Sequence, residues 1–387
     1  MRLNQLTKNL GTESAFTVLN RAASLAAQGR DIINLGIGQP DFATPPHIVD
    51  AGIKALRDGH HGYTPAKGLP QLRAAVAEDF KARRGAALDL ERILIVPGGK
   101  VTMAFAMLLL GGVGHEIIYP DPGFPIYASM IGFSGARPVP YTLSAEKGFG
   151  IDADTILEKI TPATRLLILN SPGNPTGGIN DPDEVKKLAT GLVDWPDVHI
   201  LSDEIYSRLY FDGIEHFSPF TCPEIQDRTI ILEGWSKTYA MTGWRLGWSY
   251  WPAHLIDLAE RLAINIHSCV NAPTQFAGLA AIQGPQNEVE EMRSAFQRRR
   301  DLVVGRLKTL PGVKVPLPKG AFYAFPEFNH HQLTGMQIQD RLLEEGGVAT
   351  VAGTSFGQTG TYNLRLSFAN SKENLARALN RIEDWMA

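Results

Sequence analysis

The chain has 387 residues, of which 44% are hydrophobic and 20% charged, and its formal net charge is −3. This length exceeds one ordinary hydrophobic core, so we expect two domains, and the weak net charge excludes a broad basic surface for nucleic acid or anionic membrane. Only Cys222 and Cys269 are present, which excludes a disulfide framework. Because no run resembles a signal peptide or a membrane span, we expect a soluble cytoplasmic protein.

Short apolar runs alternate with amphipathic stretches over the first two thirds of the chain. This alternation predicts a mostly parallel sheet covered by helices on both faces, with functional groups at the carboxyl ends of its strands. The buried strands are expected at 93–96, 116–119, 166–169, 199–201 and 229–232. Helices are expected between them, for example at 71–84 and 182–192.

The pattern changes at about residue 287 and predicts a smaller α+β domain. We expect the N-terminal helix near 13–28 to join it, because no strand pattern lies beside that helix. The expected order is a long charged helix at 288–308, a strand at 320–325, a helix at 336–345, a strand at 362–368 and a last helix from Lys372. The predicted division is residues 1–45 as a joining segment, 46–286 as the large domain and 287–387 as the small domain.

A lysine follows the fifth predicted strand, in the segment Ser236-Lys237 that leads to Arg245. We expect aromatic neighbours to desolvate Lys237, which lowers the pKa of a lysine and makes its amine a nucleophile. Such an amine bonds to carbonyl compounds, of which pyridoxal phosphate is the commonest, and Ser236 with Arg245 can hydrogen-bond the phosphate. A packed strand end without a ligand is the alternative. The aromatic neighbours in sequence are Trp235, Tyr239 and Trp244.

Two glycine-containing segments precede this lysine. The sequence Pro-Gly-Gly-Lys at 97–100 lies between a strand and an apolar helix, where backbone N–H groups can point at a phosphate. An ordinary strand-to-helix turn is the alternative. The sequence Gly-Ile-Gly-Gln-Pro at 36–40 lacks the third glycine of a dinucleotide fingerprint, so we expect a rigid loop that lines a cleft.

Polar residues stand at three further strands. Asn174 lies in a turn-rich stretch after one strand, where it either shapes the turn or presents a fixed amide. Asp203 ends another strand and either caps a helix or pairs with a protonated ring nitrogen, with Tyr206 one helical turn away on the same face. Arg365, inside an apolar strand, needs an anionic partner, which is a substrate carboxylate or a structural salt bridge.

In combination these motifs resemble the class I and II aminotransferases, which are fold-type I pyridoxal phosphate enzymes of the aspartate aminotransferase family. The resemblance runs from about Leu10 to the C-terminus. It implies an α/β fold, in which a large domain holds a mostly parallel, seven-stranded type of sheet between helices beside a smaller α+β domain. The motifs are Asn-Pro-Thr-Gly at 174–177, Asp-Glu-x-Tyr at 203–206, Ser-Lys-Thr-Tyr-x-Met-Thr-Gly-Trp-Arg at 236–245 and Gly-Ala-Phe-Tyr at 320–323.

The resemblance also implies a role for each matching residue and no metal site. The implied catalytic residues are Lys237, Asp203 and Tyr206. The residues implied to bind pyridoxal 5'-phosphate are Gly99, Lys100, Phe124, Asn174, Asp203, Tyr206, Ser236, Lys237, Arg245 and, from the neighbouring subunit of a homodimer, Tyr63. The residues implied to bind substrate are Gly38, Asn174, Arg365 and Lys100.

The implied reaction moves an amino group from an L-amino acid to a 2-oxo acid by a ping-pong mechanism. Because a lysine at the position of Lys100 faces the distal carboxylate in some bacterial aspartate aminotransferases, aspartate with 2-oxoglutarate is the first expectation. Alanine-type, aromatic or broad specificity are alternatives, as is a carbon–sulfur lyase on the same fold. A cofactor-binding regulator is a further alternative, but the residues before Gly11 leave no room for a DNA-binding module. Residues 3–17 and 36–44 are expected to close over the substrate.

Overall fold

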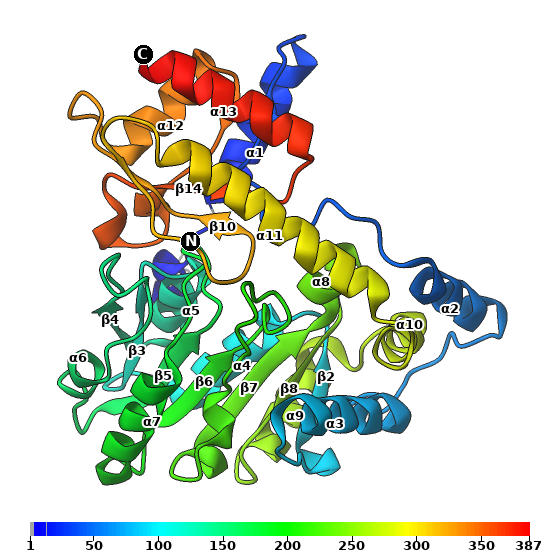
Figure 1. Cartoon of the computed structure of the whole chain (residues 1–387). Coiled ribbons are helices and arrows are strands. Elements are labelled where there is room, and N and C mark those ends of the chain that lie inside the picture. Colours follow the sequence, from blue (N-terminus) through cyan, green and yellow to red (C-terminus); the bar gives the residue numbers. More distant parts are fainter. Residues whose placement is uncertain (1–3, 13) are drawn as a thin grey trace.

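A seven-stranded sheet forms the centre of the protein (Figure 1). The structure is a computed structural model, and it describes residues 4–12 and 14–387. Its strand order is β2-β8-β7-β6-β5-β3-β4, and every strand runs parallel to its neighbours except β8, which is antiparallel to both. The predicted mostly parallel sheet is thus confirmed. The strands are β2 Ile93–Val96, β3 Glu116–Asp121, β4 Arg137–Thr142, β5 Thr164–Asn170, β6 His199–Asp203, β7 Thr229–Gly234 and β8 Gly247–Tyr250.

Two of these strands, β4 and β8, were not expected from the sequence. In β4, Pro138 and Pro140 have no N–H group to donate to a neighbouring strand. The strand accordingly lies at the edge of the sheet and pairs with β3 alone. In β8, Gly247 and Ser249 interrupt the apolar run that marks a buried strand. Both are nonetheless regular strands, because their neighbours supply the pairing.

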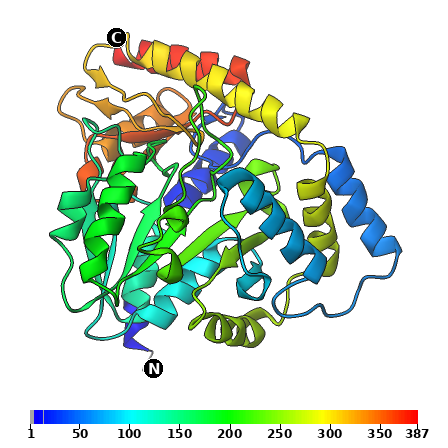
Figure 2. The same cartoon turned by 60° about the horizontal axis from the view of Figure 1, so that its bottom comes forward.

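Helices cover both faces of the sheet because its strands are apolar at successive positions (Figure 2). On β5, Leu166 and Ile168 pack against α4, α5 and α9, whereas Leu167 and Leu169 face the side of α6 and α7. The helices α3 and α10 continue that second side at the other end of the sheet. These helices are α3 Pro70–Arg84, α4 Lys100–Leu110, α5 Ile126–Ser134, α6 Ala153–Leu157, α7 Pro182–Gly191, α9 Ile256–His267 and α10 Ala272–Gln283, and α2 Pro46–Arg57 packs on α10.

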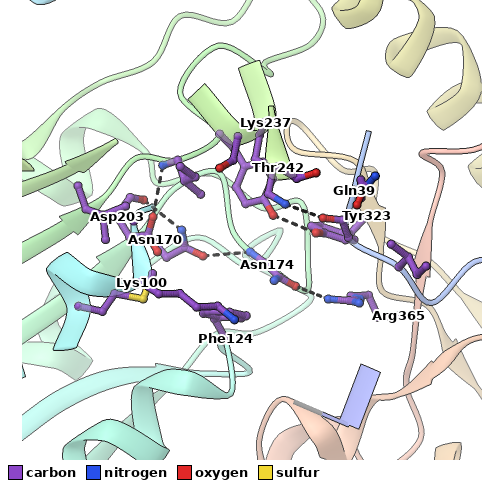
Figure 3. Close-up of a pocket in the computed structure, with 18 of the residues that line it drawn as sticks. Gln39, Lys100, Phe124, Asn170, Asn174, Asp203, Lys237, Thr242, Tyr323 and Arg365 are labelled. Carbon is purple, nitrogen blue, oxygen red and sulfur yellow. Dashed lines mark hydrogen bonds between the residues drawn. The ribbon is translucent and has the colours of Figure 1, made fainter. Parts of the chain in front are cut away.

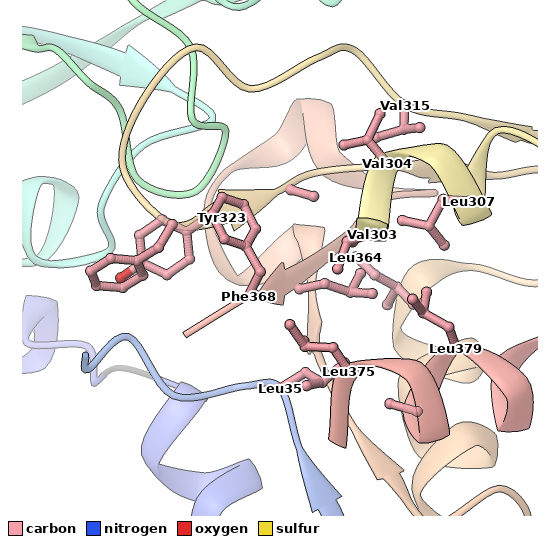
Figure 4. Packing of buried hydrophobic residues seen from close by; sticks show 14 of the residues in the cluster. Leu35, Val303, Val304, Leu307, Val315, Tyr323, Leu364, Phe368, Leu375 and Leu379 are labelled. Carbon is pink, nitrogen blue, oxygen red and sulfur yellow. The ribbon is translucent and has the colours of Figure 1, made fainter. Parts of the chain in front are cut away.

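A second hydrophobic core lies above the sheet, around the long helix α11 (Figure 4). Val304 and Leu307 of α11 contribute to it, as do Leu364 from a short strand and Leu379 from the last helix. The strands here are shorter than predicted, since only two residues of 320–325 are in a strand. The elements of this part are α11 Asn287–Leu307, α12 Gly335–Glu344, α13 Lys372–Met386, β9 Val313–Lys314, β10 Tyr323–Ala324, β11 Glu327–Phe328, β12 Val348–Ala349, β13 Val351–Ala352 and β14 Leu364–Ser367, whereas the short helix α8 Trp235–Thr238 follows β7 of the large sheet.

The N-terminal segment packs on this second core rather than on the large sheet. The strand β1 (Ile33–Asn34) pairs in parallel with β12, and Val18 of α1 (Ser14–Ala27) packs with Leu343 and Ala349. Glu13 and Leu3, which bound the predicted N-terminal helix and lid, lie outside the described residues. No helix in the described part of the chain is long and apolar enough to span a membrane.

Candidate active site

One cavity of about 490 Å³ brings together nearly all the predicted site residues (Figure 3). The carboxyl ends of β2, β3, β5, β6 and β7 meet at one edge of the sheet and lead into it. Because β8 is antiparallel, its amino end lies at the same edge, which brings in Arg245 just before it. The predicted residues that line the cavity are Gly38, Gly99, Lys100, Phe124, Asn174, Asp203, Tyr206, Ser236, Lys237, Arg245 and Arg365.

Lys237 stands in the short helix α8, immediately after β7, and its amine points into the cavity. Its Nζ donates a hydrogen bond to the Gly38 carbonyl at 2.6 Å and lies 5.8 Å from the centre of the Phe322 ring. The aromatic residues expected around it from the sequence, Trp235 among them, belong instead to the core packed against α3 and α10. Phe322 comes from a distant part of the chain, so the sequence around Lys237 could not identify it.

Asp203 ends β6 and is only 2% exposed. Its Oδ2 accepts a hydrogen bond from the Tyr127 hydroxyl at 2.5 Å, and its Oδ1 accepts one from the Ile205 N–H at 3.3 Å. Burial raises the pKa of this carboxyl group to about 6, although the Tyr127 hydroxyl acts to lower it. No helix follows Asp203, so it is not a helix cap, and Tyr206 lies in a turn rather than one helical turn further on.

Glycines leave room for a cationic and N–H-rich corner at the amino end of α4. A Cβ on Gly98 would lie 2.2 Å from Arg245 Nη2, so the guanidinium rests directly against the glycine backbone. Arg245 Nη1 also donates to the Thr242 carbonyl at 2.9 Å, which fixes the side chain. Gly99 precedes the first residue of α4, and Ser236 lines the same cavity. This corner can bind a phosphate through N–H, hydroxyl and guanidinium groups.

Arg365 in β14 enters the cavity from the second core and is 3% exposed. Its Nη1 donates to Asn174 Oδ1 at 2.9 Å and its Nη2 to the Gly36 carbonyl at 2.6 Å. The guanidinium carbon lies 4.7 Å from the ring centres of both Tyr323 and Phe356. The Asn174 N–H in turn donates to Asn170 Oδ1 at 3.0 Å, so the turn after β5 and the strand β14 are joined by hydrogen bonds (Figure 3).

The hydroxyl of Tyr206 meets that of Tyr323 at 2.9 Å. Tyr323 also explains the glycine at 38, since a Cβ there would lie 2.2 Å from its hydroxyl oxygen. Tyr323 belongs to the Gly-Ala-Phe-Tyr motif that was recognised in the sequence, but the motif predicted no role for this tyrosine. Phe16, Ile37 and Gln39 also line the cavity and lie in the segments expected to close over the substrate, whereas the lining residues to which the sequence gave no role are Leu19, Met103, Asn170, Ile205, Leu232, Thr242 and Tyr323.

Lys100 forms another side of the cavity together with aromatic rings. Its Nζ lies 5.4 Å from the centre of the Phe124 ring and 5.9 Å from that of Phe16, which α1 contributes. The cavity therefore holds two cationic side chains besides Lys237 and Arg245, namely Lys100 and Arg365. Parts of both segments that were expected to close over the substrate lie at the cavity, since Phe16 and the 37–39 loop line it.

Tyr63 is the one predicted site residue that does not line this cavity. It lies in the loop between α2 and α3 and is 92% exposed. Its side chain is therefore available to contact something other than its own chain's site.

A buried polar network lies behind Asp203. The next residue, Glu204, accepts hydrogen bonds from Ser218 Oγ at 2.5 Å and lies 2.5 Å from His216 Nε2. His216 Nδ1 lies 2.6 Å from the Tyr210 hydroxyl, which is 3.3 Å from Ser171 Oγ. These contacts join the end of β6 to the turn that carries Asn174, and they hold both strand ends in place.

The residues of this cavity fit pyridoxal 5'-phosphate. A carboxylate whose pKa is raised by burial gains from a cationic partner, and a protonated pyridine nitrogen is such a partner for Asp203. The Gly98 backbone leaves space for Arg245 at a helix amino terminus, which suits a phosphate. The amine of Lys237, which lines the same cavity, suits the aldehyde.

Comparison with known proteins agrees with this geometry. Residues 30–382 match the family model described as aminotransferase class I and II. An aspartate aminotransferase of Pyrococcus horikoshii is 39% identical over 361 residues, which cover 92% of this chain and 91% of the relative. An arginine–pyruvate transaminase of Pseudomonas aeruginosa is 36% identical over 99% of this chain and 97% of its own length.

A solved structure shares the whole fold. The aspartate aminotransferase of Thermus thermophilus with maleate superimposes with a TM-score of 0.94, at 34% identity, and covers 99% of this chain and 100% of that protein. The predicted fold class, pyridoxal phosphate cofactor and aminotransferase activity are thereby confirmed. The chain belongs to the class I and II aminotransferases, pyridoxal phosphate enzymes that move an amino group from an amino acid to a 2-oxo acid.

Proposed function

We propose that this aminotransferase acts on L-aspartate and 2-oxoglutarate by a ping-pong route. The observation that carries the proposal is that Lys100 and Arg365 line the same cavity. A dicarboxylic amino acid has one carboxylate for each of these cations. Relatives named aspartate aminotransferase support the choice, as does the similar structure with maleate, which is a dicarboxylate.

The apolar wall of the cavity favours a second candidate. Phe16, Leu19 and Met103 lie on the Lys100 side and can pack against a neutral or aromatic side chain. Alanine-type, aromatic or broad specificity therefore remains the alternative, and a relative that uses arginine and pyruvate shows that family members of similar identity differ in donor. A carbon–sulfur lyase on the same fold is the third candidate.

The cofactor-binding roles that the family resemblance implies fit the residues that lie at the sheet edge. Bound pyridoxal phosphate supplies an electron-accepting ring that stabilises negative charge at the substrate Cα. Asp203 would hold the ring nitrogen protonated, and Phe124 would stack on the ring. The hydroxyl of Tyr206 and the amide of Asn174 would hydrogen-bond the phenolic oxygen of the ring. The N–H groups of Gly99 and Lys100, together with Ser236 and Arg245, would hold the phosphate.

The substrate-handling roles fall to Lys237 and to residues of the second core. Arg365 and Asn174, already joined by a hydrogen bond, bind the α-carboxylate, and Gly38 contributes backbone. Lys237 would hold the aldehyde carbon of the cofactor through its amine, and in its free form this amine would carry a proton between the substrate Cα and the cofactor. Because its Nζ already reaches Gly38, the amine lies next to the proposed substrate position.

The test is a half-reaction screen. The cofactor-loaded protein is mixed with single L-amino acids without an acceptor, and the absorbance of the lysine-bound cofactor is followed. Stoichiometric loss, fastest with aspartate and glutamate, supports the proposal, whereas loss with neutral amino acids alone refutes acidic specificity. Continuous product release while the absorbance persists identifies a lyase. Lys100→Ala should slow aspartate far more than alanine, and an equal loss on both contradicts the role of Lys100.

We propose further that the protein works as a homodimer in which Tyr63 reaches the phosphate of the partner's site. The exposure of Tyr63, together with the exposed Ile264 and Ile266 on α9, supports this. Mixed dimers of Lys237→Ala and Tyr63→Phe contain one site with both intact residues. Activity of the mixture above that of the separate variants supports a shared site, and purely additive activity refutes it.

We also propose a cytoplasmic location and a division into two units. Residues 46–286 form the large cofactor-binding unit, and 287–387 form the small unit with residues 1–45 attached, since α1 and β1 pack there. The two free cysteines support a reducing compartment. Native-state hydrogen exchange tests the division, because two units should show two different opening free energies.

A further inference from the structure

The carboxylate of Asp203 has one side-chain donor in this structure that sequence reasoning did not identify. Tyr127, in the first turn of α5, is fully buried and donates its hydroxyl hydrogen to Asp203 Oδ2 at 2.5 Å. Tyr127 does not line the cavity, so it stands behind Asp203 relative to the ligand. A group in this place can act on the cofactor only through the lining residues that it contacts.

The environment of Tyr127 makes it a permanent donor. Burial, and next the negative charge of Asp203, raise the pKa of the Tyr127 hydroxyl well above its usual value, so the proton stays on the oxygen. A hydroxyl that always donates stabilises the ionised form of the acceptor carboxylate and fixes its orientation. Asp203 needs such help, because its burial alone disfavours the charged form.

Tyr127 also touches the residue on another wall of the site. Its ring packs edge-on against Phe124 with the centroids 5.8 Å apart and the planes at 84°. One side chain therefore contacts both the carboxylate and the aromatic ring to which cofactor-binding roles are assigned above. Phe124 lies two residues before α5, and its carbonyl accepts a hydrogen bond from the Tyr127 N–H at 3.0 Å, so this turn sets the relative position of the two residues.

We propose that Tyr127 is a positioning residue of this site, which keeps Asp203 ionised and oriented toward the protonated ring nitrogen of pyridoxal phosphate. The proposal rests on the proposed role of Asp203. A purely structural role is the competing explanation, since the Tyr127 ring also belongs to the core between the sheet and α4. The two explanations differ in one respect: only the positioning role predicts that loss of the Tyr127 hydroxyl weakens binding solely of a ligand that has the ring nitrogen.

The variant Tyr127→Phe removes only the hydroxyl and keeps the packed ring. Tyr141→Phe is a matched control, because Tyr141 is 1% exposed and its hydroxyl donates to a backbone carbonyl, that of Ile168, at 3.0 Å. Binding to each cofactor-free protein is measured for pyridoxal phosphate and for its analogue with C–H in place of the ring nitrogen. Thermal unfolding of each cofactor-free variant shows that it is folded.

Tyr127→Phe should bind pyridoxal phosphate about 10-fold more weakly than the wild type does, as expected for loss of a hydrogen bond to a charged group. Its affinity for the analogue should be unchanged, and Tyr141→Phe should bind both ligands like the wild type. An equal loss for both ligands in Tyr127→Phe overturns the proposal in favour of a structural role. No loss for either ligand overturns it as well.

The variant Asp203→Asn separates this proposal from the function on which it rests. Suppose that the wild type binds pyridoxal phosphate more tightly than the analogue and that Asp203→Asn binds both equally. Asp203 then acts on the ring nitrogen, and the result for Tyr127→Phe alone decides the proposal. If Asp203→Asn discriminates as the wild type does, the role of Asp203 itself is wrong, and the proposal falls with it. Tyr127→Phe in the Asp203→Asn background should have no further effect on binding.

Discussion

The contact between Gly98 and Arg245 allows a sharp test of the phosphate corner. In Gly98→Ala the new methyl group would lie 2.2 Å from Arg245 Nη2 and 2.8 Å from Cζ. Non-bonded carbon and nitrogen atoms need about 3.5 Å, so the guanidinium must move by more than about 1 Å. The backbone is also in the left-handed region at φ +91°, which costs a non-glycine residue.

Two separate effects are expected from this substitution. The left-handed backbone costs about 1–2 kcal/mol of stability for an alanine. Displacing Arg245 should remove the proposed charged hydrogen bond to the phosphate, worth about 1.5–3 kcal/mol, so the Kd for pyridoxal phosphate should rise roughly 10- to 150-fold. The first effect is shared by any glycine of this conformation, whereas the second belongs to Gly98 alone.

Gly114→Ala is the control, because Gly114 has φ +88° and no atom within 4 Å of its added Cβ. Thermal unfolding of the cofactor-free proteins should show similar destabilisation in both variants, and titration with pyridoxal phosphate should show weaker binding only in Gly98→Ala. In an Arg245→Ala background, Gly98→Ala should add little. Equal cofactor affinity in the two glycine variants would refute the argument, as would a full additional loss without Arg245.

Three further predictions concern individual side chains of the cavity. Arg365→Lys should lower kcat/KM about 10- to 100-fold on all amino acids alike, because an ammonium cannot bind a carboxylate in a bidentate way; steady-state kinetics on aspartate and alanine checks this. Tyr323→Phe should raise KM several-fold with little change in cofactor affinity, since its hydroxyl contacts Tyr206 at 2.9 Å and its ring lies against Arg365; comparing KM with the Kd for pyridoxal phosphate checks this. The pKa of Asp203 is raised from 3.8 to about 6, so between these pH values the folded cofactor-free protein binds more protons than the unfolded chain. Its free energy of unfolding should therefore fall by about 3 kcal/mol as pH rises through this range. Denaturant unfolding at several pH values checks this, and the loss should be absent in Asp203→Asn.

The sequence predicted the residues at the sheet edge well because each follows a recognisable strand. Asp203 and Lys237 come directly after the apolar runs of β6 and β7, and parallel strands bring such positions together. The helices α3 and α11 were also predicted to within a residue at each end. In these cases the local pattern and the tertiary structure agree.

Contacts between distant segments were not predictable in the same way. The ring near Lys237 is Phe322, which is far along the chain, and the partners of Arg365 are Asn174 and the Gly36 carbonyl. Hydrophobic periodicity carries no information about which distant side chain faces which. The strand β4 was missed for a related reason, since its prolines are acceptable only because the sheet ends there.

The proposed cofactor ligands and some of the proposed substrate ligands come from two different parts of the fold, whereas Lys100 and Asn174 lie at the sheet edge. The proposed cofactor ligands, such as Asp203 and Ser236, stand at the edge of the large sheet, where strand pairing fixes them. The proposed substrate ligands Arg365 and Gly38, and the nearby Phe16, come from the second core and the N-terminal segment that packs on it. A small shift of that part against the sheet would change the distance between Arg365 and the proposed cofactor ligands, and it would strain the hydrogen bonds that join Arg365 to Asn174 and Lys237 to the Gly38 carbonyl. Such an arrangement lets side-chain specificity vary among relatives with the cofactor chemistry kept, as their different donors indicate.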